Sequence, residues 1–114
     1  MTSRALSVVA LLSACVARAP AAAQVDVRGA WHAANDCFIQ AFVLADGGAA
    51  SITYSNGTNE QRMRWTWSRE GLAISSERRG ALLMNGHYQD ALLVAEVDYS
   101  TTDDIDFRTC SFAR

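Results

Sequence analysis

Apolar and polar residues alternate with a period of two through most of the chain beyond residue 27. In one such segment Met63, Trp65 and Trp67 occupy alternate positions, and arginine, threonine and serine fill the positions around them. The same alternation recurs at Leu72 and Ile74, at Leu93, Ala95, Val97 and Tyr99, and at Ile105 and Phe107. Because a period of two is typical of β-strands with one buried face, we expect these apolar side chains to point into a core.

Turn-forming dipeptides separate the alternating segments. Asp46-Gly47, Asn56-Gly57 and Asn85-Gly86 are among them, and such pairs supply the positive φ angles of tight hairpins. We expect strands at 27–32, 36–44, 49–54, 61–68, 72–78, 81–88, 91–99 and 105–112. Short strands at this spacing predict an all-β fold, an antiparallel meander of about eight strands that closes as a small barrel, with a sandwich as the alternative.

One predicted strand differs from the others. Residues 37–44 are apolar on both faces, which indicates a strand that is covered on its outer side as well. A short helix is the alternative interpretation of this segment.

The first residues have the order of a secretory signal peptide. The charged start up to Arg4 precedes the apolar run 5–14 and the small-residue junction 21–23, which predicts cleavage after Ala23. The chain then divides into a signal peptide, residues 1–23, and a single β-barrel domain, residues 24–114. The alternative is a lipoprotein, because Leu12–Cys15 resembles a lipobox in which Cys15 is lipidated. Both interpretations predict export to the periplasm or secretion, and no segment is long enough to predict a transmembrane helix.

The charge of the predicted domain argues against nucleic acid as a partner. Without Arg4 and Arg18, 8 of the 10 basic residues remain against 12 acidic ones, which gives a net charge of −4. Binding to a phosphate backbone requires a basic footprint that this composition lacks. The five arginines between residues 62 and 79 have glutamates as neighbours, so we expect cross-strand ion pairs. The alternative is a basic patch that binds the carboxylates of a partner.

Three cysteines are present, and cleavage or lipidation of the leader accounts for Cys15. The remaining Cys37 and Cys110 predict one disulfide in an oxidising compartment. Metal ligation is the alternative, but it requires further ligands at close spacing, and the histidines are His32 and His87, far apart in the sequence. No catalytic motif accompanies either histidine. We therefore expect no metal, no cofactor and no enzymatic activity.

Gly29-x-Trp31 at the head of the first predicted strand, followed by a meander, resembles the calycins, the lipocalin-like and avidin-like small barrels. The resemblance implies that Trp31 packs across a closed end of the barrel and that the last strands close against the first. It also implies an accompanying arginine near the C-terminal strand, for which Arg108 and Arg114 are the candidates.

The function predicted from these patterns is an exported, non-enzymatic binding module that holds a small apolar ligand in its barrel. Small barrels leave room for side chains or for one small ligand, and five residues are candidates to line such a site: Trp31, Tyr54, Met63, Trp65 and Trp67. The alternative role for them is simple core packing. The alternative function is an envelope inhibitor or accessory protein that binds a protein partner through surface loops such as residues 55–61.

Overall fold

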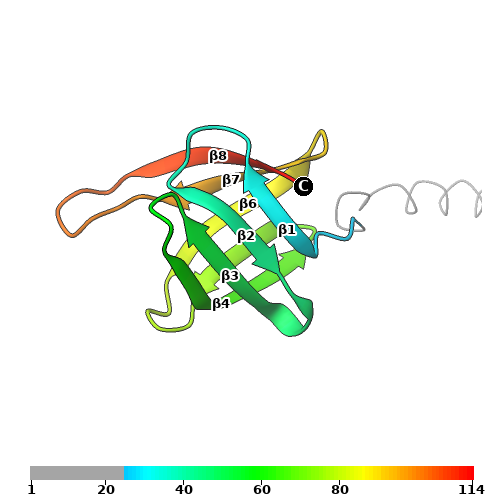
Figure 1. The fold of residues 1–114 in the computed structure, drawn as a ribbon, viewed down its shortest axis with the longest axis horizontal. Coiled ribbons are helices and arrows are strands. Elements are labelled where there is room, and N and C mark those ends of the chain that lie inside the picture. The colour runs from blue at the N-terminus through cyan, green and yellow to red at the C-terminus, as the bar shows by residue number, and fades with distance from the viewer. Residues whose placement is uncertain (1–24) are drawn as a thin grey trace, which may run out of the picture.

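The computed structural model describes residues 25–114, so the predicted signal peptide and Cys15 lie outside the described residues. Eight antiparallel strands form a closed barrel in which each strand pairs with its neighbours in sequence (Figure 1). The strands are β1 (Gly29–Ala33), β2 (Ile39–Leu44), β3 (Ala49–Tyr54), β4 (Asn59–Ser68), β5 (Gly71–Ser76), β6 (Leu82–Gln89), β7 (Leu92–Asp98) and β8 (Phe107–Ala113). The predicted all-β meander that closes as a barrel is confirmed.

The barrel closes where β8 returns to β1. His32 and Ala33 pair with Ala113 and Phe112, and the side chain of Asn35 continues the contact beyond the end of β1. Its amide nitrogen donates to the Thr109 carbonyl at 3.3 Å, and its oxygen accepts from the Ser111 backbone N–H at 2.9 Å. This pairing of β1 with β8 closes the sheet, and a closed sheet leaves no long unpaired edge.

Large apolar side chains fill the interior of the barrel. Phe42 and Phe112 meet edge to face with their ring centres 4.8 Å apart, and Trp31, Met63 and Met84 are buried around them. The predicted inward faces of β4, β5 and β7 are confirmed, since Met63, Leu72, Ile74, Leu93, Ala95 and Val97 are buried. An eight-stranded barrel has an interior about wide enough for such side chains.

The segment that is apolar on both faces is a strand over 39–44, and the predicted outer cover is wrong. Val43 is 42 % exposed. The register shifts between Ile39 and Ala41, which leaves Gln40 as an extra residue and places both Ile39 and Phe42 inside. A β-bulge therefore breaks the period of two and makes a one-sided strand look two-sided in the sequence.

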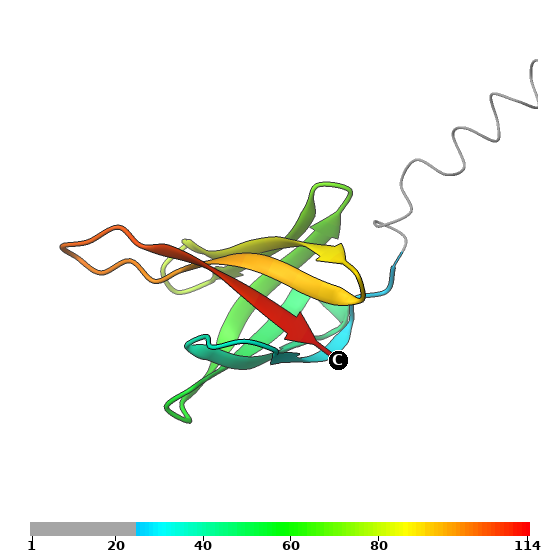
Figure 2. The same cartoon turned by 90° about the horizontal axis from the view of Figure 1, so that it is seen from above.

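The predicted burial of Ile105 and Phe107 is also wrong. Ile105 is 82 % exposed and Phe107 is 57 % exposed. In β8 the inward positions are those of Cys110 and Phe112, and β8 begins only at Phe107. The hairpin between β7 and β8 projects beyond the barrel, as Figure 2 shows, so the side chains on it have no core to reach.

Of two glycine-containing turns that the sequence predicts, the structure forms one and not the other. Asp46–Gly48 forms the predicted turn, a short 3₁₀ segment in which Gly47 and Gly48 have φ angles of 80° and 84°. Asn85-Gly86, in contrast, lies inside β6 and is not a turn. A Cβ at Gly86 would lie 2.4 Å from the Val94 carbonyl oxygen, so this glycine permits the close approach of β6 and β7.

Among residues 25–114, no helix is long and apolar enough to cross a membrane.

The predicted disulfide is confirmed, with Cα atoms of Cys37 and Cys110 5.9 Å apart. Cys37 lies in the loop before β2, and Cys110 lies on the inner face of β8. The two cysteines are 73 residues apart. On the chain-entropy model a loop of this length stabilises the fold by about 4 kcal/mol.

Candidate functional site

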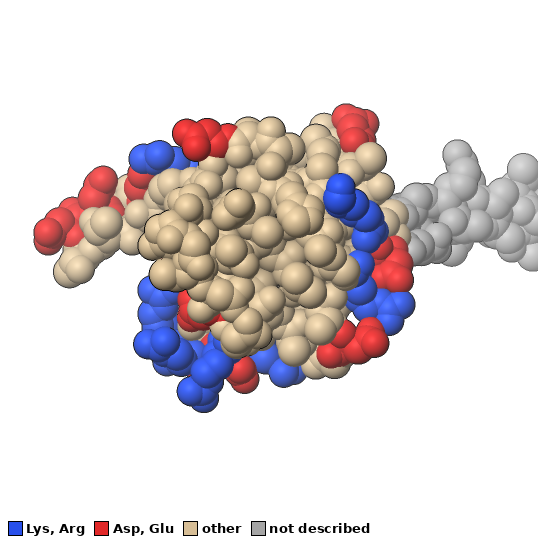
Figure 3. Space-filling view, in the orientation of Figure 1, with Lys and Arg blue, Asp and Glu red and all other residues tan. Residues whose placement is uncertain are grey.

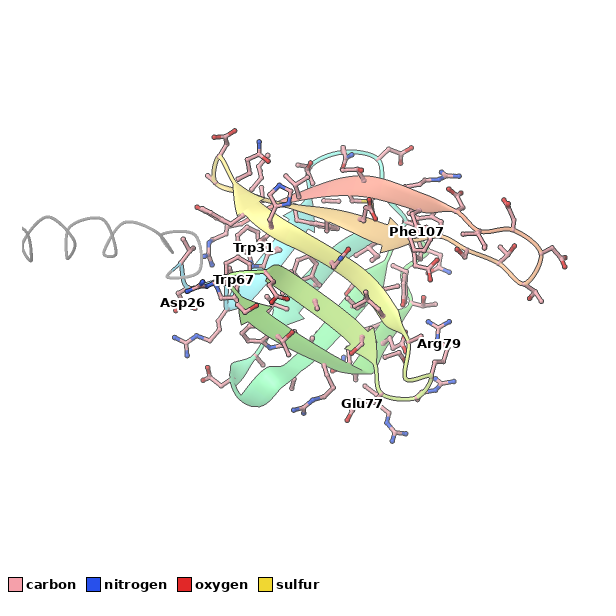
Figure 4. The ribbon with its side chains drawn as sticks, turned by 180° about the vertical axis from the view of Figure 1, so that it is seen from behind. Asp26, Trp31, Trp67, Glu77, Arg79 and Phe107 are labelled. Carbon is pink, nitrogen blue, oxygen red and sulfur yellow. A yellow bond between two sulfur atoms is a disulfide. The ribbon has the colours of Figure 1, made fainter. Side chains whose placement is uncertain are left out.

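The two ends of the barrel differ in how they are covered. The chain enters at one end, where the β2–β3, β4–β5 and β6–β7 turns and the C-terminus also lie; we call it the closed end. The loops β1–β2, β3–β4, β5–β6 and β7–β8 lie at the other end, which we call the mouth. Figure 4 shows Asp26, Trp31 and Trp67 toward the closed end, and Glu77, Arg79 and Phe107 toward the mouth.

Trp31 and Arg114 close the first of these ends. The buried indole nitrogen of Trp31 donates to the Val27 carbonyl at 2.8 Å, which brings Val27 into the core. The guanidinium of Arg114 lies over the indole, 4.4 Å from the ring centre. It also donates to the carbonyls of Arg28, at 3.0 Å, and Asp26. The C-terminus, the entering segment and β1 are thus joined at one point.

Ion pairs reinforce this closure from outside. Arg28 contacts the carboxylates of Asp26 at 2.8 Å and Asp46 at 2.6 Å, so the entering segment is tied to the β2–β3 turn. The hydrogen bonds that the Arg28 side chain and backbone N–H donate hold the pKa of Asp26 well below its ordinary value. All three side chains are exposed, so salt screens these contacts.

The five candidate ligand residues do not form one group. Trp31 and Met63 are buried in the filled interior. Trp65 and Trp67 are half-buried on the inner face of β4 and pack against the core, and the Trp65 indole nitrogen donates to the Ala45 carbonyl at 2.8 Å, in the β2–β3 turn of the closed end. Tyr54 ends β3 at the mouth. The structure therefore separates Tyr54 from the tryptophans.

Three aromatic side chains, Phe38, Tyr54 and Tyr99, lie together at the mouth; we call them the aromatic cup. The rings of Phe38 and Tyr54 stack with centres 5.5 Å apart, and those of Phe38 and Tyr99 meet edge to face at 4.4 Å. The Phe38 backbone N–H donates to the Tyr99 hydroxyl at 2.7 Å. Each ring is partly exposed, so the cup offers apolar surface to solvent.

Local sequence explains how these rings reach the mouth. Tyr54 follows the buried Ile52, and Tyr99 follows the buried Val97, each two residues on along the same inward face. Phe38 is adjacent to Cys37, whose disulfide fixes the β1–β2 loop to β8. The period of two already placed Tyr99 on an inward face, but the sequence alone did not identify Tyr99 or Phe38 as site residues, because their meeting depends on the closure of the barrel.

Two open hollows adjoin at the aromatic cup. One, of about 370 Å³, is lined by Phe38, Tyr54, Arg79, Leu83, Asp98, Tyr99 and Ser100. The other, of about 480 Å³, is lined by Tyr54, Thr58, Asn59, Glu60, Gln61, Arg62, Arg78 and Arg79. Tyr54 and Arg79 belong to both. Volumes of this size are in the range that small ligands occupy.

Glu60 faces the mouth because of a second bulge. The β3–β4 register shifts between Ala50 and Ile52, which pairs Glu60 with the buried Ile52 and turns its side chain to the inner face. The Tyr54 hydroxyl donates to the Glu60 carboxylate at 2.8 Å. Burial, followed by this hydrogen bond and the carboxylate charge, raises the pKa of Tyr54 to about 12, although the charge of Arg79 acts in the opposite direction.

Asp98 is the second carboxylate at the mouth. It accepts a hydrogen bond from the Ser100 backbone N–H at 2.8 Å. Hydrogen bonds from the Ser100 side chain and backbone lower the pKa of Asp98, and the positive charge of Arg79 lowers it further. Arg79 lines the same hollow as Tyr54 and Asp98, so its charge acts on both groups.

The expected ion pairs between the arginines of residues 62–79 and their glutamates are absent. Within the described part of the chain, the ion pairs join Arg28 to Asp26 and Asp46, and Arg108 to Asp106. The bulge that turns Glu60 inward removes one of the expected partners. Figure 3 shows one group of basic side chains at the lower left and another along the right edge, with acidic side chains at the tip of the projecting hairpin.

A metal site would need several histidine, cysteine or carboxylate side chains close together. Residues 25–114 contain no group of three or more histidine, cysteine, aspartate or glutamate side chains that could hold a metal ion. His87 instead contacts the Gln89 side-chain oxygen at 2.9 Å.

Comparison with known proteins identifies no relative: no family model, no curated protein and no solved structure matches this chain.

Proposed function

We propose that this protein is an exported, non-enzymatic binding module that holds a small apolar ligand in the aromatic cup. The observation that carries the proposal is the contrast between the two ends. At one end Trp31 is fully buried beneath Arg114. At the other end the rings of Phe38, Tyr54 and Tyr99 stay partly exposed, although Arg108 lies over Tyr99. Exposed aromatic surface in a concave site is typical of ligand binding.

The filled interior limits where a ligand can lie. Phe42, Phe112 and Met63 occupy the barrel, so the ligand rests at the mouth and does not enter the core. A ligand in such a cup buries only part of its surface. At about 0.3 kcal/mol per non-hydrogen atom, a molecule of about 20 atoms binds with about 6 kcal/mol, a dissociation constant of tens of micromolar.

Two further observations support the proposal. Arg114, which follows β8 and lies over Trp31, matches the accompanying arginine that the resemblance to calycins implies, and small eight-stranded barrels can hold one small ligand. The Cys37–Cys110 disulfide is typical of proteins in oxidising compartments, which supports export to the periplasm or secretion. The mass of the protein recovered from the cell envelope tests how the leader is processed. Cleavage after Ala23 is expected, and a diacylated Cys15 would favour the lipoprotein alternative.

A fluorescent probe tests ligand binding. N-phenylnaphthylamine is neutral and apolar, and its emission rises when it leaves water. We expect saturable binding to the wild-type protein and about tenfold weaker binding to Phe38→Ala, which removes the ring that contacts both tyrosines; a lost aromatic contact has about this effect.

The control for this experiment is Trp65→Phe, which lies toward the closed end and keeps an apolar ring. Binding unchanged in Trp65→Phe supports the mouth as the site. A loss in Trp65→Phe that equals the loss in Phe38→Ala would instead favour a site beside Trp65 and Trp67. No saturable binding to the folded wild-type protein would contradict the proposed function.

One observation favours the alternative, a protein-binding module that acts through surface loops. The β7–β8 hairpin projects from the barrel (Figure 2) and exposes 82 % of Ile105, and a protruding apolar side chain is suited to insertion into a partner's pocket. The test compares envelope proteins retained by the wild-type protein and by Ile105→Ser. A single protein retained by the first and lost by the second would favour this alternative.

A further inference from the structure

We propose that the ligand of the aromatic cup carries one negative charge, which the arginines beside the cup bind. This inference rests on the proposed function and specifies the chemical class of its ligand. Its basis is the junction of the two hollows, because Arg79 lines both, and Arg62 and Arg78 line the second. A ligand whose ring lies on Tyr54 therefore has guanidinium groups within reach of a polar substituent.

The guanidinium groups of these three arginines are available. The ion pairs among residues 25–114 use Arg28 and Arg108, and the other arginine side chains with hydrogen bonds to described residues are Arg64 and Arg114. Arg62, Arg78 and Arg79 are exposed. A planar guanidinium without a protein partner is well matched to a carboxylate, sulfonate or phosphate, since it donates two parallel hydrogen bonds.

The carboxylates at the mouth set the charge of the ligand. Glu60 and Asp98 line the hollows, and each already accepts a hydrogen bond from a neighbouring group. Their charges oppose two of the three arginines, which leaves an excess of one positive charge among the lining residues. This balance fits an organic monoanion better than a dianion or a cation.

The position of Arg79 connects the apolar and charged parts of the site. Its side chain lines the same hollow as Phe38, Leu83 and Tyr99, and Figure 4 shows it at the mouth. The apolar part of the ligand lies on the aromatic cup, and its anionic group lies on Arg79. A ligand that has both parts is an amphipathic organic acid, and free acids and acidic lipid headgroups share this chemistry.

A matched pair of probes tests the inference. Anilinonaphthalene sulfonate has the scaffold of N-phenylnaphthylamine with one added sulfonate. For the wild-type protein at low ionic strength we expect the sulfonate to bind about five times more tightly than the neutral probe, a difference that a partly exposed ion pair supplies. About 0.5 M sodium chloride should remove most of that preference, because it screens exposed charges.

Variants locate the charge effect. Arg79→Gln should weaken binding of the sulfonate about fivefold more than it weakens binding of the neutral probe. Arg69→Gln removes the same charge from the β4–β5 turn at the closed end, and it should change neither affinity. Near-ultraviolet circular dichroism confirms that each variant keeps its packed core, since the sulfonate probe also binds partly unfolded proteins.

The outcomes separate the two proposals. The inference about charge is overturned, and the proposed function stands, if the neutral probe binds but the sulfonate probe binds no more tightly. The same conclusion follows if Arg79→Gln and Arg69→Gln have equal effects on binding of the sulfonate probe. If neither probe binds, both are overturned. Once the preference is established, a soluble aryl carboxylate and vesicles of an acidic phospholipid distinguish the two sources by competition with the bound sulfonate.

Discussion

The guanidinium carbon of Arg114 lies 4.4 Å from the centre of the Trp31 indole ring. Arg114 is the last residue of the sequence, and Trp31 lies in β1, so the contact joins the two strands that close the barrel. It also covers the end of the core at which the chain enters, because the same guanidinium donates to the Arg28 and Asp26 carbonyls. The mouth is left as the open end of the molecule.

Loss of the Arg114 side chain should destabilise the barrel. Arg114→Ala removes a cation–π contact and hydrogen bonds to two backbone carbonyls, and we expect the free energy of unfolding to fall by about 1 kcal/mol. Urea denaturation measures the change. Arg69→Ala, in an exposed turn, is the control and should stay within about 0.5 kcal/mol of wild type. Equal effects of the two variants would show that the Trp31 contact contributes nothing to stability.

Removal of the disulfide should affect both stability and the mouth. For the Cys37→Ser, Cys110→Ser double variant, unfolding should require about 3–4 kcal/mol less than for the oxidised protein. Because Phe38 follows Cys37 in the same loop, the variant should also bind N-phenylnaphthylamine more weakly under conditions in which it remains folded. Unfolding curves and probe titrations of the same samples check both parts, and an unchanged affinity would show that the disulfide does not position the cup.

The Tyr54 hydroxyl should ionise late in an alkaline titration. Its pKa is raised to about 12, first by burial and then by the Glu60 carboxylate. A phenol whose folded pKa exceeds its unfolded value of about 10 favours the folded state below pH 10, and this contribution is lost as the pH rises through about 12. Phenolate absorbance of wild type and Tyr54→Phe should differ by one group that titrates near pH 12; a difference centred near pH 10 would contradict the placement of Tyr54.

Steric contact should make Gly86 harder to replace than Gly57. A Cβ at Gly86 would lie 2.4 Å from the Val94 carbonyl oxygen and 2.7 Å from Ala95 Cα, whereas one at Gly57 meets nothing within 4 Å. Gly57 has a φ of 90°, so Gly57→Ala should cost about 1 kcal/mol from backbone strain alone. We expect Gly86→Ala to cost more, about 2–4 kcal/mol. Thermal unfolding compares them, and a smaller loss for Gly86→Ala would be inconsistent with the strand spacing.

The sequence by itself determined where most strands lie and which of their faces point inward. Met63 in β4, Ile74 in β5 and Val97 in β7 are buried as the alternation predicts, because a β-strand directs successive side chains to opposite faces whatever surrounds it. The pairing of Cys37 with Cys110 also followed from the sequence, since the predicted domain contains no other cysteine. These features depend on local geometry and on composition.

The tertiary structure alone decided how the site is assembled. Of the five predicted ligand residues, Tyr54 lies in the aromatic cup, and its neighbours Phe38 and Tyr99 come from loops 61 positions apart. Bulges turned the Glu60 side chain inward and made the β2 sequence look apolar on both faces. A bulge exchanges the inward and outward positions of the residues beyond it, and the composition does not reveal this change. At the closed end Arg114 lies over the fully buried Trp31, and at the mouth Arg108 lies over the partly exposed Tyr99. The length of β8 separates these two arginines, but only the closure of β8 against β1 brings Arg114 to Trp31, because residues so far apart in the sequence meet through tertiary pairing alone.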